Sequence, residues 1–97
     1  MSESAPSGTL YYVVRKDLPW DRRCVQLIHA REKYAEIHEE GRTRVHTAVV
    51  YGVSDEAVLK AVFFGLLDHK ATLFHEPDLQ EYTALCTDHG PLTLPLL

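Results

Sequence analysis

The chain has 97 residues, of which 45% are hydrophobic and 25% are charged, and its net charge is −4 at neutral pH. This length predicts one domain with a single core, and no apolar run approaches the roughly 20 residues that a membrane span needs. The acidic balance argues against a generic nucleic-acid-binding domain, which is usually basic. A local basic patch is still expected, because the first third of the chain gathers Arg15, Lys16, Arg22, Arg23 and Arg31.

The first eight residues, MSESAPSG, contain neither a basic region nor an apolar stretch of the kind that secretory signals carry. They predict a disordered tail over residues 1–8, followed by a single domain over residues 9–97. Cys24 and Cys86 lie inside apolar patterns and lack CxxC spacing, which predicts buried free thiols. We therefore expect a protein of the reducing cytoplasm.

Residues 9–15, TLYYVVR, predict a strand that is buried on both faces, because the run does not alternate polar and apolar residues. A turn follows over residues 17–21, and Pro19 cannot continue a strand. A helical period then runs from Trp20 to about Glu40, where Gly41 supplies a stop. The expected core face of this helix is Trp20, Cys24, Leu27, Ile28, Tyr34, Ala35 and Ile37.

The rest of the chain predicts a strand over 44–53, a helix over about 54–69, and short strands over 71–75 and 82–87. Ser54 is the expected capping hydroxyl of the second helix, followed by acids in the first turn. The order β-α-β-α-β-β predicts an α/β fold with a mixed four-stranded sheet and helices packed on its faces. Two crossovers would make the first three strands parallel, and the short last connection would make the fourth antiparallel.

The first helix carries a polar stripe of Arg22, Gln26 and His29, because residues three and four apart share a helix face. We place this stripe beside the core face, starting at the helix N-terminus, where backbone N–H groups favour an anion. Arginine matches phosphate or carboxylate, glutamine can orient a water, and histidine exchanges protons near neutral pH. The stripe is suited to water attack on an ester, although ordinary surface groups show the same pattern.

Two acids, Glu76 and Asp78, flank Pro77 near the end of the third expected strand, and Thr83 opens the fourth. The acids could act as a base and its orienting partner, and Thr83 could present its hydroxyl to the same edge. A solvated turn and an ordinary strand threonine are the structural alternatives. No spacing of a zinc site and no phosphate-binding glycine loop is present, so we expect no metal and no cofactor.

The segments VVRKDL, QLIHA and EPDLQEYTAL resemble the type II peptidyl-tRNA hydrolases and their small bacterial relatives, over about residues 10–87. That family has a four-stranded mixed sheet and cleaves the ester between a peptide and its tRNA. By this resemblance Gln26 and His29 match the helix pair of the family, and Thr83 matches its last-strand threonine. Arg22 falls on the family's helix lysine, and its D-A-G-x-T segment has no counterpart, with Asp68 or Asp78 as substitutes.

The resemblance implies a peptidyl-tRNA hydrolase-like protein of translation, with Arg22, Gln26, His29, Asp78 and Thr83 as catalytic residues. Arg15, Asp17 and Arg23 would bind the substrate, and tRNA or peptidyl-tRNA would be the partner. The alternatives are a catalytically inactive module of the same fold that binds RNA, a nucleotide or a protein, and an enzyme acting on another small ester or amide. A homodimer is an open expectation, and no membrane partner is expected.

Overall fold

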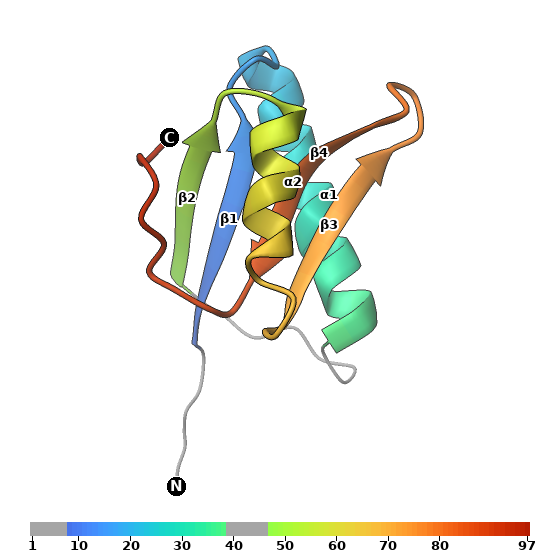
Figure 1. Cartoon of the computed structure of the whole chain (residues 1–97). Coiled ribbons are helices and arrows are strands. Elements are labelled where there is room, and N and C mark those ends of the chain that lie inside the picture. Colours follow the sequence, from blue (N-terminus) through green and yellow to red (C-terminus); the bar gives the residue numbers. More distant parts are fainter. Residues whose placement is uncertain (1–7, 39–46) are drawn as a thin grey trace, which may run out of the picture.

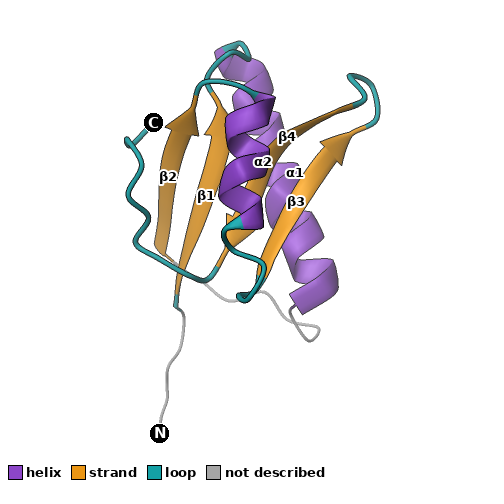
Figure 2. Cartoon of the chain, in the orientation of Figure 1, coloured by secondary structure: helices purple, strands orange, loops and turns teal. Residues whose placement is uncertain are grey.

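The computed structural model describes residues 8–38 and 47–97, and their elements follow the expected order β-α-β-α-β-β (Figure 1). The elements are β1 (Thr9–Arg15), α1 (Trp20–His38), β2 (Thr47–Val53), α2 (Glu56–Phe64), β3 (Ala71–Glu76) and β4 (Glu81–Thr87). The strands form one sheet, with α1 on one face and α2 on the other (Figure 2). The expected α/β fold with a mixed four-stranded sheet is confirmed.

The prediction that the first three strands are parallel is confirmed only in part, because β1, β2 and β3 run in one direction but β3 does not pair with either of the other two. The strand order is β2-β1-β4-β3, and the only parallel pair among the described strands is β1 with β2. β4 lies between β1 and β3 and is antiparallel to both, so β3 has the direction of β1 without pairing with it. The short hairpin explains this order, because β3 and β4 are neighbours in sequence and pair with each other, leaving β4's other edge for β1.

β1 occupies the centre of the sheet, as its continuous apolar sequence predicts. It pairs with β2 on one side and β4 on the other, and the side chains of Val13 and Val14 are fully buried on opposite faces. Alternation along β1 feeds two separate cores. Leu10, Tyr12 and Val14 pack with Ala30 and Tyr34 of α1, whereas Val13 packs with Leu59 of α2.

The core face of α1 differs from the predicted one. The buried residues are Gln26, Ala30 and Tyr34, which repeat every four positions. Four of the predicted core residues are instead exposed, namely Trp20, Cys24, Ile28 and Ile37. The helix is therefore rotated relative to its most hydrophobic stripe. Gln26, expected beside the core face, lies on it.

α2 begins with a side-chain cap supplied by Asp55 rather than by the expected Ser54. The Asp55 carboxylate accepts a hydrogen bond from the backbone N of Val58 at 3.0 Å, which satisfies one of the helix's free amides. Leu59 is fully buried and Leu66 nearly so, but Val58 and Leu67 of the expected core face are exposed. The helix proper ends at Phe64, earlier than the predicted end near residue 69.

The C-terminal segment covers the outer edge of β2. The backbone N of Gly52 donates to the Pro95 carbonyl at 3.0 Å, and the N of Leu97 donates to the Val50 carbonyl at 3.0 Å. Three features expected from the sequence lie outside the described residues: the tail over residues 1–8 except for its last residue, the stop at Gly41 and the start of the second strand before Thr47. No helix within the described ranges is long and apolar enough to cross a bilayer.

Candidate functional site

Gln26 is the centre of a buried polar cluster between α1 and the sheet. Its side chain is almost completely buried, with the residue 1% exposed. Gln26 Nε2 donates to Glu76 Oε1 at 2.9 Å, and Gln26 Oε1 accepts a hydrogen bond from Thr83 Oγ1 at 2.8 Å. The amide thus joins the end of β3 to the start of β4. Both of its polar atoms have a partner, as a buried polar group requires.

A β-bulge aims Thr83 into this cluster. The β3–β4 register pairs Phe74 with Ala84 but His75 with Tyr82, so Thr83 is an extra residue on β4. Ala84 packs in the core that contains Ala30 of α1, and strict alternation would point Thr83 to the opposite face. Because of the bulge, Thr83 and Ala84 both face α1.

Of the two acids that flank Pro77, Glu76 is the one in the cluster, whereas the family resemblance implied Asp78. Glu76 Oε1 accepts from Gln26, and Glu76 Oε2 accepts from the backbone N of Asp78 at 3.1 Å. The hydrogen bond from Gln26, followed by that from Asp78, lowers the pKa of Glu76, and the charges of His29 and Arg22 act in the same direction. Asp78 is exposed in the turn and contributes its backbone. Glu76 is therefore an ionised carboxylate at neutral pH.

His29 lies at the boundary between the cluster and solvent. Its Nδ1 is 3.6 Å from Glu76 Oε1, and 36% of its side chain is exposed. The ring packs against Phe74 of β3, with 4.9 Å between the ring centroids. Nδ1 makes no hydrogen bond to the described residues, so a small shift of the ring would bring it into contact with the carboxylate. Histidine and glutamate together form a dyad that can hold and transfer a proton.

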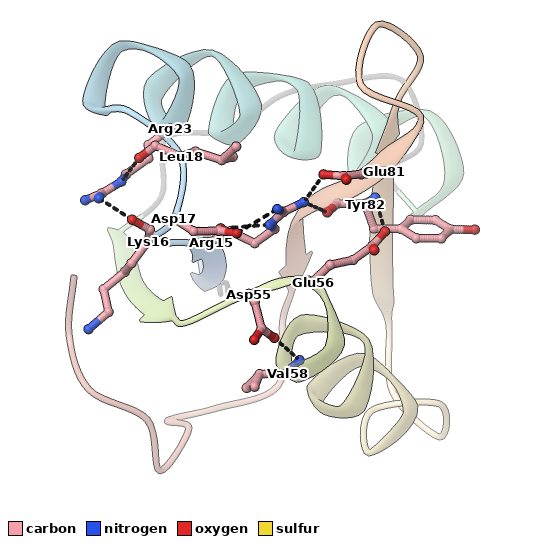
Figure 3. A network of polar contacts seen from close by, with 10 residues as sticks. All are labelled: Arg15, Lys16, Asp17, Leu18, Arg23, Asp55, Glu56, Val58, Glu81 and Tyr82. Carbon is pink, nitrogen blue, oxygen red and sulfur yellow. Dashed lines mark hydrogen bonds and ion pairs between the residues drawn. The ribbon is translucent and has the colours of Figure 1, made fainter.

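Arg15 and Asp17, both predicted to bind substrate, are bound to each other. Arg15 Nε and Nη2 donate to the two carboxylate oxygens of Asp17 at 2.9 and 2.8 Å (Figure 3). Arg15 Nη1 reaches across to Glu81 Oε1 at 2.8 Å and to the Tyr82 carbonyl at 3.1 Å. The Arg15 bond lowers the pKa of Asp17, and the pKa of Arg15 is raised, chiefly by the bond to Asp17. Arg15 is buried, with the residue 7% exposed, and its guanidinium is engaged within the protein.

Of the two remaining predicted arginines, Arg23 is bonded within the protein and Arg22 is exposed. Arg23 donates from Nε to the Leu18 carbonyl at 2.7 Å and from Nη2 to the Lys16 carbonyl at 2.6 Å (Figure 3). Its guanidinium also lies 4.4 Å from the centre of the exposed Trp20 ring, so Arg23 holds the turn before α1 together. Arg22 is exposed, and its charge favours the ionised form of Glu76. Of the predicted arginines, Arg22 is the one placed to meet an anion.

The structure thus brings Gln26, His29 and Thr83 together and adds Glu76. Among the residues described, His, Cys, Asp and Glu side chains form no group of three or more that could hold a metal ion. The donor set is an amide, a hydroxyl, an imidazole and a carboxylate, which is suited to moving a proton and orienting a water. The sequence signal for Glu76 was its position at the end of a strand, directly before a proline.

A groove of about 320 Å³ lies on the opposite flank of α1, between that helix and β2. It is lined by Tyr12, Leu27, Ile28, Arg31, Glu32, Ala48 and Val50. Apart from Arg31 and Glu32 these residues are apolar or aromatic. The groove therefore offers shape and hydrophobic contact, but it does not contain the proton-transfer groups of the Gln26 cluster.

No protein-family model matches this chain, and no curated protein does. Inference about function therefore rests on the geometry of the Gln26 cluster and on the sequence resemblance. Both concern the same residues, because Gln26, His29 and Thr83 come from two of the three segments that carry the resemblance.

Proposed function

We propose that this protein is a peptidyl-tRNA hydrolase-like enzyme that cleaves the ester between a peptide and tRNA. The observation that carries the proposal is the buried Gln26 amide, hydrogen-bonded on one side to Glu76 and on the other to Thr83, with His29 beside the carboxylate. The segments that resemble type II peptidyl-tRNA hydrolases contain all four residues, and Gln26, His29 and Thr83 match residues of that family. The substrate class comes from that resemblance, and the reaction type is supported by the chemistry of the cluster.

The burial of this cluster supports a functional role, because burial of polar groups is costly. Glu76 is 7% exposed and Thr83 is fully buried. Even when hydrogen-bonded, a buried polar set stabilises a fold little more than well-packed apolar residues do. A set of polar side chains that are all hydrogen-bonded does, however, hold each side chain in one orientation. A carboxylate and an imidazole with fixed directions are what general base catalysis requires.

In the proposed reaction His29 and Glu76 act as one base. A carboxylate beside Nδ1 favours the tautomer that carries its proton there, which leaves Nε2 to accept a proton. Nε2 takes a proton from a water whose oxygen attacks the ester carbonyl carbon. The bond from that carbon to the ribose oxygen then breaks, and the imidazolium returns the proton to the leaving ribose hydroxyl. Gln26 and Thr83 hold Glu76 in place during these steps.

The N-terminal end of α1 supports an anionic substrate. Arg22 is exposed on the first turn of the helix, and Lys16 is exposed in the turn that precedes it. An arginine fork favours phosphate or a developing oxyanion. Because phosphate contacts release counterions, binding of tRNA to this surface should weaken steeply as salt is added.

The test is hydrolysis of an N-acetyl-aminoacyl-tRNA by wild-type protein, with Glu76→Gln and Arg22→Ala measured beside it. Glu36→Gln, which removes an exposed acid near the other end of α1, is the matched control for loss of one negative charge. We expect wild type and Glu36→Gln to release the acetyl-amino acid and Glu76→Gln to lose most of the rate. An ester that stays intact with micromolar wild-type enzyme would rule out the hydrolase.

A catalytically inactive module of the same fold, which binds RNA, a nucleotide or a protein, is the second candidate. The observation that favours it is the internal use of Arg15 and Arg23, which leaves a smaller basic surface than the sequence suggested. A salt titration of tRNA binding separates the two candidates. Salt-sensitive binding without hydrolysis supports the module, whereas no binding at low salt removes tRNA as the partner of either.

A further inference from the structure

The residue before Thr83 is held by side chains from two other elements. Arg15 of β1 donates from Nη1 to the Tyr82 carbonyl at 3.1 Å and to Glu81 Oε1 at 2.8 Å (Figure 3). Glu56, at the start of α2, accepts a hydrogen bond from the backbone N of Tyr82 at 2.9 Å. Both backbone polar groups of Tyr82 are thus bound by side chains at the point where the bulge disturbs the pairing with β3.

The hydrogen bonds that Arg15 and Glu56 make to the Tyr82 backbone affect the orientation of the Thr83 side chain. The Tyr82 carbonyl and the Thr83 amide belong to one planar peptide unit, so a bond that fixes the carbonyl also fixes the plane from which Thr83 leaves. Thr83 is the extra residue of the bulge, and regular strand pairing alone would direct it to the other face. The contacts of Arg15 and Glu56 therefore stabilise the conformation in which Thr83 Oγ1 reaches Gln26.

The other end of the Arg15 fork binds the turn before α1, the helix that carries Gln26. Nε and Nη2 bind both carboxylate oxygens of Asp17, in the turn that leads into α1 and hence to Gln26. A guanidinium is planar and presents its donors in a fixed geometry. One rigid group therefore spans the strand that carries Thr83 and the turn that starts the helix carrying Gln26.

We propose that Arg15, with Glu56, is a positioning residue that keeps Thr83 directed at Gln26 and thereby holds the Gln26–Glu76 contact in place. This role replaces the substrate contact that the sequence suggested for Arg15. Its consequence for catalysis rests on the proposed ester hydrolysis. Its structural content, the direction of Thr83 and the burial of the Gln26 amide, does not depend on that activity.

The test compares Arg15→Lys with wild type in the full chain, because lysine keeps the positive charge but cannot span Asp17, Glu81 and the Tyr82 carbonyl. Leu10→Ala, at the other end of β1 and buried in the core, is the control for a loss of stability that leaves the bulge untouched. Two quantities are measured: solvent exchange of the Gln26 side-chain amide by NMR, and kcat and KM on N-acetyl-aminoacyl-tRNA.

We expect Arg15→Lys to lose protection of the Gln26 amide and to lower kcat by about 10- to 100-fold, the size of effect that a small misplacement of reacting groups produces. KM should stay close to that of wild type, since Arg15 does not contact substrate. Leu10→Ala should keep the protection and the kcat while unfolding at a lower temperature. If Arg15→Lys does not fold, Glu56→Ala is measured in its place, with the same expected losses.

Retention of Gln26 protection in Arg15→Lys would overturn the proposal, and so would a raised KM with kcat unchanged, which would make Arg15 a substrate contact. If wild type does not hydrolyse the ester at all, the proposed function fails. The exchange of the Gln26 amide then still decides whether Arg15 and Glu56 position Thr83.

Discussion

The two flanks of α1 make different kinds of contact, polar toward β3 and β4 and mainly apolar toward β2. Toward β3 and β4 the helix presents Gln26, which is buried against Glu76 and Thr83 with a hydrogen bond to each. Toward β2 it presents Leu27 and Ile28 to an apolar groove that also contains Val50. Gln26 and Leu27 are neighbours in sequence, so adjacent positions within one helical turn face a paired polar cluster and a mainly apolar groove.

This difference indicates where side-chain orientation matters, because hydrogen bonds fix the orientation of the groups that they join. Apolar contacts are non-directional and tolerate changes of shape at modest cost. A buried polar cluster loses much more when one member is removed, because the remaining groups are left without partners. The fold could have been held by apolar residues on both flanks, and we therefore assign the chemistry to the polar flank. Four predicted effects test this contrast.

The largest effect is expected from removing the charge of Glu76. Glu76→Gln keeps the shape of the side chain but removes the carboxylate beside His29, and general base catalysis is commonly worth about 100-fold or more. We expect kcat on N-acetyl-aminoacyl-tRNA to fall by about that factor. Asp78→Asn, two residues on, should lose far less, because Asp78 reaches the cluster through its backbone N. Equal losses in the two variants would contradict the choice of Glu76 as the acid.

The next effect is on stability and concerns Gln26 itself. Gln26→Leu leaves the Thr83 hydroxyl and the Glu76 carboxylate buried without the partner they now share, which should cost about 2–4 kcal/mol of unfolding free energy. Leu27→Ala, on the apolar flank and partly buried, should cost about 1–2 kcal/mol. Urea unfolding measures both. A Gln26→Leu variant as stable as wild type would show that the cluster is not tightly paired.

A smaller effect should appear in the dependence of stability on pH. The folded pKa of Glu76 lies below its ordinary value of 4.5, so the unfolded chain binds this proton more tightly than the folded one. The resulting stability is complete above that ordinary value and is lost as the pH falls through the lower folded pKa. Thermal unfolding between pH 7 and pH 3 should show a shallower acid loss in Glu76→Gln than in wild type.

Asp17 contributes in the same direction, because its pKa is lowered by Arg15. Asp17→Asn should therefore also flatten the acid limb of the unfolding curve. Leu27→Ala is the matched comparison from the apolar flank. It should lower the unfolding temperature by a similar amount at every pH, and a changed slope in that variant would count against Glu76 and Asp17 as the source.

The smallest effect is expected on the outer side of the apolar flank. Ile28 is 59% exposed, and substitution of an exposed residue away from special features usually changes stability by about 0.5 kcal/mol or less. Ile28→Ser should therefore unfold close to wild type and hydrolyse N-acetyl-aminoacyl-tRNA at the wild-type rate. A marked loss of hydrolysis would instead place part of the substrate in the groove beside β2.

The sequence by itself determined the elements and much of their local chemistry. The uninterrupted apolar residues of β1 indicated its central position, and the structure confirms it. Glycine and proline positions and the acids before α2 located the turns and helix starts to within a few residues. These features are local, because backbone propensity, capping and hydrophobic period act over a few neighbouring residues. Gln26, His29 and Thr83 could also be selected from their residue types and spacing.

Only the tertiary structure decided how these pieces meet. The rotation of α1 that buries Gln26 and exposes Ile28 depends on the sheet beneath it, whereas the helical period alone favoured a neighbouring face of the helix. The position of β4 between β1 and β3, and the bulge that turns Thr83 toward α1, depend on pairing between distant segments. Arg15 reads as a surface cation in the sequence, yet its partner Glu81 lies 66 positions away. Such long-range contacts set the orientation of the side chains, and the candidate site depends on that orientation.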